Sequence, residues 1–178
     1  MAIIKCGTEE MVTIGEVPAI GTLSPDFTVC NSDFVLFNLT EDYKNQHVVL
    51  FVIPSLDTAT CVKCLNHLSR IERDKKMNYL VITSDTPFAL KRLSASFPFS
   101  FEYICSDMVL KEFGQQYNVR IDSGPLTSLL ARSVFVLDHE HKIAHVDLSD
   151  DIAVPINYEL LETRIDEVMQ QQIEHSKV

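Results

Sequence analysis

The chain has 178 residues, 46% hydrophobic and 22% charged, which is the size and composition of one compact domain spanning residues 1–178. Its 25 acidic and 15 basic residues give a formal net charge of −10, which disfavours nucleic acids and anionic membrane surfaces as partners. No apolar run approaches the roughly eighteen residues that a membrane-spanning helix needs.

The N-terminal residues and the cysteines together predict the cellular compartment. Residues 1–15 lack the long apolar core of a signal peptide and include Glu9 and Glu10, so we expect a cytoplasmic protein whose thiols are kept reduced. Five cysteines, an odd number, then predict reactive or buried thiols rather than a disulfide framework.

The first half of the chain predicts short strands and one amphipathic helix. Two apolar runs within residues 1–15 flank a polar turn and predict an N-terminal β-hairpin, and Phe27–Cys30 predicts a short strand. Val48–Ile53 is entirely apolar and mostly β-branched, which is typical of a strand covered on both faces. Pro54 ends that strand, and apolar residues spaced three apart predict a helix from about residue 60 to 74.

The second half alternates predicted strands with helices and ends in a hairpin and a helix. This order favours an α/β fold with a mixed central sheet covered on both faces, and a thioredoxin-like three-layer α/β/α sandwich with an N-terminal hairpin extension fits it best. The predicted strands are Tyr79–Thr83, Phe101–Cys105, Val134–Leu137 and Ile143–Val146, and the predicted helices are Phe88–Ser96, Val109–Tyr117 and Tyr158–Ile173.

Cys61 is the candidate nucleophile because of its place at the start of a helix. The unpaired backbone N–H groups and the positive end of the helix dipole converge there, and both favour a thiolate, the form that attacks electrophiles. Thr58 can present its hydroxyl to the sulfur or to an incoming oxygen, and Pro54 fixes the exit from the preceding strand. From position alone, a small buried cysteine without chemistry is an equally good interpretation.

The residues around Cys61 form a motif. Pro54, Thr58 and Cys61 make up a Pro-x-x-x-Thr-x-x-Cys pattern that resembles the peroxiredoxins, and the fuller Pro-Ser-Leu-Asp-Thr-x-x-Cys, with Asp57, resembles their bacterial thiol peroxidase branch. The resemblance extends to the N-terminal hairpin, to residues 84–89, to residues 122–126 and to residues 131–138.

The resemblance implies a thiol peroxidase that reduces hydrogen peroxide and alkyl hydroperoxides. Cys61 would attack the peroxide and become a sulfenic acid, while Arg132, which opens an apolar strand, would face the sulfur and stabilise charge on the departing oxygen. A thioredoxin or similar thiol reductant would recycle the enzyme, no metal or organic cofactor would be needed, and a homodimer would be expected.

The second, resolving cysteine departs from the family pattern. The usual position falls in the segment 91–96, which contains serines and no cysteine. Cys64, at i+3 on the same helix face as Cys61, is the first substitute, and Cys105 is the second. Cys6 and Cys30 lie in strand-like segments and are expected to be structural. A cycle with one protein cysteine, resolved by an outside thiol, also stays open.

A partly dry substrate pocket is expected near the motif. Its candidate lining is apolar, which would suit a small or alkyl hydroperoxide. The candidates are Leu56, Phe88, Leu93 and Phe97.

Two other functions remain open alongside a peroxidase. A thioredoxin-like dithiol oxidoreductase could use the Cys61–Cys64 pair, although thioredoxins carry a proline where this chain has Ala131-Arg132-Ser133. A non-catalytic redox-sensing or interaction module would predict that Thr58 and Arg132 make no contact with Cys61. The histidines near the predicted hairpin turn match no familiar zinc spacing and are expected to be solvated; they are His139, His141 and His145.

Overall fold

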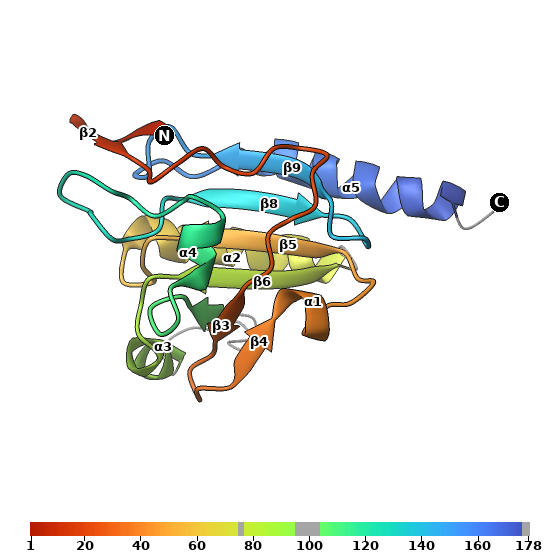
Figure 1. The fold of residues 1–178 in the computed structure, drawn as a ribbon, viewed down its shortest axis with the longest axis horizontal. Coiled ribbons are helices and arrows are strands. Elements are labelled where there is room, and N and C mark those ends of the chain that lie inside the picture. Colours follow the sequence, from red (N-terminus) through yellow and green to blue (C-terminus); the bar gives the residue numbers. More distant parts are fainter. Residues whose placement is uncertain (75–76, 95–103, 176–178) are drawn as a thin grey trace.

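The computed structural model describes residues 1–74, 77–94 and 104–175, and within these residues seven strands form one mixed sheet in the order β4-β3-β7-β6-β5-β8-β9 (Figure 1). β1 and β2 pair separately and form the predicted N-terminal hairpin. The strands are β1 (Ile3–Cys6), β2 (Glu9–Val12), β3 (Thr28–Cys30), β4 (Leu36–Asn38), β5 (Val48–Ile53), β6 (Asn78–Thr83), β7 (Ile104–Ser106), β8 (Ser133–Leu137) and β9 (Ile143–Leu148), and the helices are α1 (Leu39–Asp42), α2 (Ala59–Asp74), α3 (Pro87–Ser94), α4 (Glu112–Gln116) and α5 (Tyr158–His175).

The central strand β5 divides the interior into two cores. All six of its side chains are buried, and successive side chains of a strand point to opposite faces of the sheet. Val48, Leu50 and Val52 accordingly belong to one apolar cluster. The alternate residues of β5 belong to the other cluster; they are Val49, Phe51 and Ile53.

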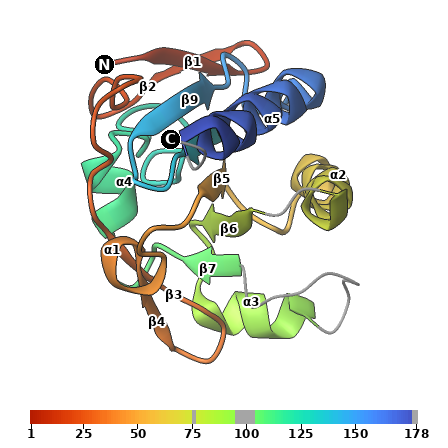
Figure 2. The same ribbon diagram turned by 90° about the vertical axis from the view of Figure 1, so that its right-hand side faces the viewer.

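Helices cover both faces of the sheet and complete three layers. Buried residues of α2 and α5 join the cluster that contains Phe51, whereas residues of α1 and α4 join the cluster that contains Leu50. Figure 2 shows α2 and α5 on one side of the sheet and α1 and α4 on the other. The predicted thioredoxin-like α/β/α sandwich with its hairpin extension is therefore confirmed.

The strand directions bring three chain segments together at one end of the central strands. β5 and β6 run parallel, so the residues after Ile53 and after Thr83 emerge side by side. β8 runs antiparallel to β5 and pairs Ser133 with Val52, so the chain entering β8 through Arg132 arrives at the same end. The start of α2, the segment after β6 and Arg132 therefore converge.

The N-terminal hairpin is attached to the segment that follows β9. The Lys5 N–H donates to the Asp150 carbonyl at 2.8 Å, and the Ile152 N–H donates to the Lys5 carbonyl at 2.9 Å. The hairpin thus fixes the path of the chain through Ile152, whose carbonyl reaches the candidate site.

The helix α4 is shorter than predicted. The helix predicted from Val109 begins only at Glu112, because Lys111 adopts a left-handed conformation (φ 59°) and the Asp107 carboxylate accepts the N–H groups of Phe113 and Gly114 at 2.9 and 3.0 Å. Among the helices that the structure describes, none has the length and apolarity required to cross a membrane.

Candidate active site

Cys61 lies in the first turn of α2 and is fully buried. The Cys61 N–H donates to the Thr58 hydroxyl oxygen at 3.2 Å, so Thr58 caps the helix as well as flanking the cysteine. Pro54 and Thr58 line the same cavity as Cys61. The structure therefore brings together the three residues of the Pro-x-x-x-Thr-x-x-Cys motif.

The Arg132 guanidinium bridges two sulfur atoms. Nη2 donates to the Cys61 sulfur at 3.4 Å and Nη1 donates to the Cys64 sulfur at 3.3 Å. Nε and Nη2 also donate to the Ile152 carbonyl at 3.1 and 2.9 Å, which fixes the plane of the group. The predicted convergence of Arg132 on Cys61 is thus present, and the contact with Cys64 is an additional finding.

Burial makes this cation unusually influential. Arg132 is 1% exposed, and among the described residues no carboxylate lies within ion-pair distance of it. A buried charge without a counter-charge is costly, so its environment favours negative charge on the neighbouring sulfurs. A non-catalytic module predicted no contact of Thr58 or Arg132 with Cys61, and that expectation is wrong.

Cys64 is a buried thiol whose ionisation is opposed by its surroundings. Burial raises the pKa of Cys64, the Tyr158 hydroxyl and the Arg132 guanidinium lower it, and negative charge on Cys61 raises it. Two neighbouring sulfurs sharing one cation are not readily ionised together, because like charges repel. The arrangement therefore suits one thiolate at a time.

Cys105, the second resolving candidate, is poorly placed for that role. Its side chain belongs to the core on the opposite face of the sheet from Cys61 and Cys64. Burial, together with the nearby Cys30, raises the pKa of Cys105 to about 12. The sequence could not predict which core receives Cys105. Successive side chains of β7 point to opposite faces of the sheet, and only the register of the strand decides which face Cys105 takes.

A cavity of about 250 Å³ opens beside Cys61, and its lining corrects the predicted pocket. Leu56 is fully buried, Phe88 is 72% exposed with its ring against Phe34, and Leu93 packs against the α2 and α5 core. Phe97 lies outside the described residues. The lining consists of Cys6, Pro54, Ser55, Thr58, Thr60, Cys61, Leu126, Leu129, Arg132, Ile152 and Ala153.

Several residues of this lining were not anticipated. Cys6, expected to be structural, reaches the cavity because the hairpin folds back onto the segment through Ile152. Leu126 and Leu129 come from an irregular segment without hydrophobic periodicity, of which the family resemblance includes Leu126. That resemblance was the one signal that could have pointed to Leu126, and no signal in the sequence pointed to Leu129.

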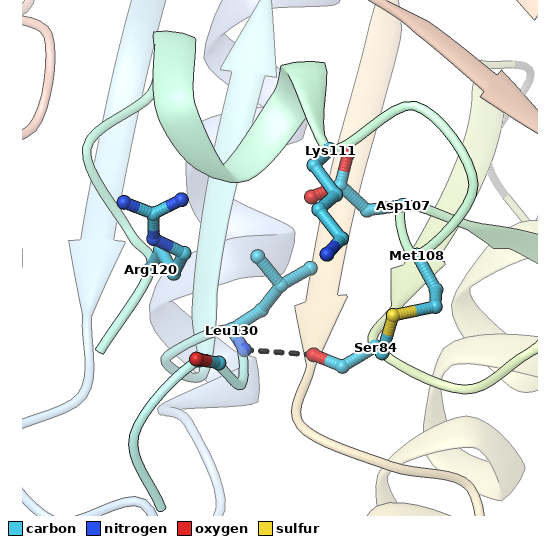
Figure 3. A pocket seen from close by; sticks show the side chains of 7 residues that line it. Ser84, Asp107, Met108, Lys111, Arg120 and Leu130 are labelled. Atoms are coloured by element: carbon cyan, nitrogen blue, oxygen red, sulfur yellow. Dashed lines mark hydrogen bonds between the residues drawn. The ribbon is translucent and has the colours of Figure 1, made fainter. Parts of the chain in front are cut away.

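A second, smaller cavity of about 90 Å³ lies behind the same irregular segment (Figure 3). Its edge is tied to β6, because the Leu130 N–H donates to the Ser84 hydroxyl at 2.7 Å. Asp107 lies in the wall of this cavity, and burial raises its pKa to about 6. The lining contains no thiol; it consists of Ser84, Asp107, Met108, Lys111, Arg120, Ser128 and Leu130.

Two of the three histidines near β9 are not solvated as predicted, whereas His139 lies partly exposed in the turn. His141 and His145 are buried, and a ring nitrogen of His141 lies 2.9 Å from the Tyr43 carbonyl oxygen. In the part of the chain that the structure describes, no three histidine, cysteine or acidic side chains gather as metal ligands would.

Comparison with known proteins identifies the family. Residues 19–161 match the family model described as Redoxin. A thiol peroxidase of Oceanobacillus iheyensis is 31% identical over 160 residues, covering 89% of this chain and 95% of the relative, and a thiol peroxidase of Mycobacterium tuberculosis is 29% identical over the same shares. A peroxiredoxin-like protein from Aquifex aeolicus has a structure that aligns with a TM-score of 0.85 at 26% identity, covering 94% of this chain and 98% of that one.

The chain therefore belongs to the Redoxin family. Its relatives and its fold place it in the peroxiredoxin superfamily, in the bacterial thiol peroxidase branch. It is accordingly an enzyme that reduces peroxides by means of a thiol.

Proposed function

We propose that Cys61 is the nucleophile of this peroxidase and that Arg132 is its electrostatic partner. The Cys61 thiolate attacks one peroxide oxygen, so an S–O bond forms, the O–O bond breaks and the sulfur is oxidised to a sulfenic acid. The other oxygen leaves as an alkoxide or hydroxide and takes a proton from solvent to give an alcohol or water. The observation that carries this proposal is the 3.4 Å hydrogen bond from Arg132 Nη2 to the Cys61 sulfur, beside a cavity that both residues line. The same guanidinium can stabilise charge on the departing oxygen.

Cys64 is the resolving thiol in this proposal. Its sulfur attacks the Cys61 sulfenic acid, an S–S bond forms, the S–O bond breaks, and the leaving hydroxide takes up the Cys64 proton to give water. Support comes from the shared guanidinium, which holds both sulfurs with neighbouring nitrogens. A thioredoxin-type dithiol then reduces the disulfide and is itself oxidised.

The substrate and the setting complete the proposal. The cavity wall beside Cys61 is contributed largely by Leu126, Leu129, Ile152 and Ala153, which suits a small or alkyl hydroperoxide. A cytoplasmic homodimer is proposed from the family resemblance. Exposed apolar side chains at 34–36, at Phe88 and at 108–110 offer apolar surface that such a dimer could cover.

The assignment of both cysteines is tested by mass spectrometry after one equivalent of hydrogen peroxide. We expect a Cys61–Cys64 disulfide in the wild type, and a sulfenic or sulfinic Cys61 in Cys64→Ser, because that variant lacks the resolving sulfur. Cys61→Ser should abolish turnover. The measurement is peptide mapping of alkylated, unreduced protein together with peroxide consumption.

The other cysteines supply the controls for that experiment. Cys105→Ser and Cys6→Ser should still form the Cys61–Cys64 disulfide, since Cys105 faces the other core and the Arg132 guanidinium holds Cys61 together with Cys64. A Cys61–Cys6 or Cys61–Cys105 disulfide in the wild type would contradict the assignment of Cys64. Normal peroxide reduction by Cys61→Ser would contradict the assignment of the nucleophile.

A further inference from the structure

Tyr158, the first residue of α5, carries a buried hydroxyl that the cycle described above does not use. Its ring packs against the core that contains Cys61 and Cys64. The hydroxyl makes no hydrogen bond of standard geometry with the described residues. A buried hydroxyl without a partner destabilises the fold, so a place where one is kept beside a reacting group calls for a functional explanation.

The orientation of the Tyr158 ring is fixed by α2. His67 stacks on it with ring centroids 3.9 Å apart and an interplanar angle of 17°. His67 Nε2 in turn lies 3.6 Å from a carboxylate oxygen of Glu162, one turn further along α5. Because His67 follows Cys64 by three residues on the same helix, this stack aligns the phenol with the Cys64 side of α2.

The Tyr158 hydroxyl and the Cys64 sulfur influence each other's ionisation. The hydroxyl lowers the pKa of Cys64, against the larger effect of burial. Burial, with the Cys64 sulfur next in effect, raises the pKa of Tyr158 well above its ordinary value. The phenol therefore keeps its proton at working pH, and it can act as a hydrogen-bond donor but not as a base.

The charge around Cys64 changes during the catalytic cycle. In the reduced enzyme, negative charge on Cys61 opposes ionisation of Cys64 and engages the Arg132 guanidinium. Once Cys61 becomes a neutral sulfenic acid, that repulsion is removed. The guanidinium and the phenol then both stabilise a Cys64 thiolate, the species that must attack.

We propose that Tyr158 is a catalytic residue of the resolving step, whose hydroxyl donates a hydrogen bond to the Cys64 sulfur as that sulfur loses its proton and attacks the Cys61 sulfenic acid. The phenol itself transfers no proton in this step: the Cys64 proton leaves with the sulfenic hydroxyl as water while the S–S bond replaces the S–O bond. This inference rests on the proposed function of Cys64.

Tyr158→Phe keeps the ring and its stack on His67 and removes only the hydroxyl. Reduced enzyme is mixed with one equivalent of hydrogen peroxide, quenched with an alkylating agent at successive times and analysed by mass spectrometry from pH 5 to 9. Oxidation of Cys61 should stay within about twofold of wild type, while disulfide formation should slow about tenfold, as expected for loss of one hydrogen bond to a charged group. The pH at which disulfide formation reaches half its maximal rate should rise, because a thiolate without its donor forms only at higher pH.

Tyr79→Phe is the matched control. Tyr79 is another buried tyrosine of the same core whose hydroxyl lacks a partner among the described residues, and its pKa is raised by burial and by acidic side chains rather than by a sulfur. Both steps should proceed in Tyr79→Phe as in the wild type.

The outcomes separate the two levels of the proposal. A wild type that forms no Cys61–Cys64 disulfide overturns both the Cys64 assignment and the role of Tyr158. A wild type that forms it, with an unchanged rate and pH profile in Tyr158→Phe, overturns the role of Tyr158 alone, as does an equal slowing of both steps with no change in the profile. If Tyr158→Phe does not fold, 3-fluorotyrosine at position 158, a stronger donor of nearly the same shape, should move the profile to lower pH, and an unchanged profile overturns the proposal.

Discussion

One guanidinium governs two thiols at this site. Arg132 is buried in a protein of net charge −10, donates to the sulfurs of Cys61 and Cys64, and is held in place by a backbone carbonyl rather than by a carboxylate. Because no carboxylate among the described residues neutralises it, its full charge acts on whichever sulfur is ionised. Its planar fork matters as much as its charge, since a lysine ammonium could not face both sulfurs and the Ile152 carbonyl in one plane.

Arg132→Lys tests the importance of that fork at the scale of one residue. The second-order rate constant of Cys61 with hydrogen peroxide should fall by about 10²- to 10³-fold, because a positioned donor to the reacting centre is lost while a positive charge is retained. Stopped-flow kinetics measures the rate. Arg120→Lys, at a half-buried arginine in the second cavity that no cysteine lines, should stay close to wild type. Equal losses in both variants would contradict a specific role for Arg132.

The connection between β5 and α2 depends on the neighbouring strand β6. The Asp85 carboxylate accepts hydrogen bonds from the Ser55 hydroxyl at 2.8 Å, the Leu56 N–H at 2.6 Å and the Thr83 hydroxyl at 2.7 Å. A single carboxylate just beyond β6 therefore satisfies the turn that delivers Cys61 to the start of its helix. The parallel pairing of β5 and β6 makes this possible, because their carboxyl ends share one edge.

Asp85→Asn should loosen that connection. The amide replaces one accepting oxygen with a donor that faces other donors, so we expect the free energy of unfolding to fall by about 1–3 kcal/mol. Urea denaturation measures it. Asp33→Asn is the control, since its exposed pair with Lys91 contributes little and the loss should stay within about 0.5 kcal/mol. A comparable loss in both variants would show that Asp85 has no special structural role.

At the scale of the molecule, the sequence predicts the layers well and the cavity poorly. The apolar run of β5 and the spacing in α2 determine local structure directly, and the Pro-x-x-x-Thr-x-x-Cys motif lies within one short segment, so its residues could be recognised together. The cavity wall depends instead on how separate segments meet. Docking of the hairpin brings Cys6 to the cavity, and the turn after β9 brings Ile152. Phe88 points outward, and Leu90 is the residue of α3 that is buried in the core.

The pH dependence of stability is a property of the whole fold to which Asp107 contributes. Burial raises the pKa of Asp107 from 3.8 to about 6. Between pH 3.8 and about 6, the folded protein therefore keeps a proton on Asp107 that the unfolded chain has lost. Stability should therefore decline as pH rises from about 4 to 6, by about 2–3 kcal/mol for this group, and then level off.

Asp107→Asn removes that titration while keeping one oxygen that can accept from the start of α4. The difference between wild-type and variant unfolding free energies, measured by urea denaturation from pH 4 to 7, should show the decline in the wild type alone. A parallel decline in the variant would assign the titration to another group.

The N-terminal hairpin is hydrogen-bonded to the turn through Ile152, and the carbonyl of Ile152 holds the guanidinium in its plane. The extension therefore works as a brace, joining the first residues of the chain to the reactive sulfurs through one peptide group. Substitutions in the hairpin other than at Cys6 can therefore change peroxide reactivity without altering any residue of the cavity lining, so the extension should evolve together with the catalytic centre.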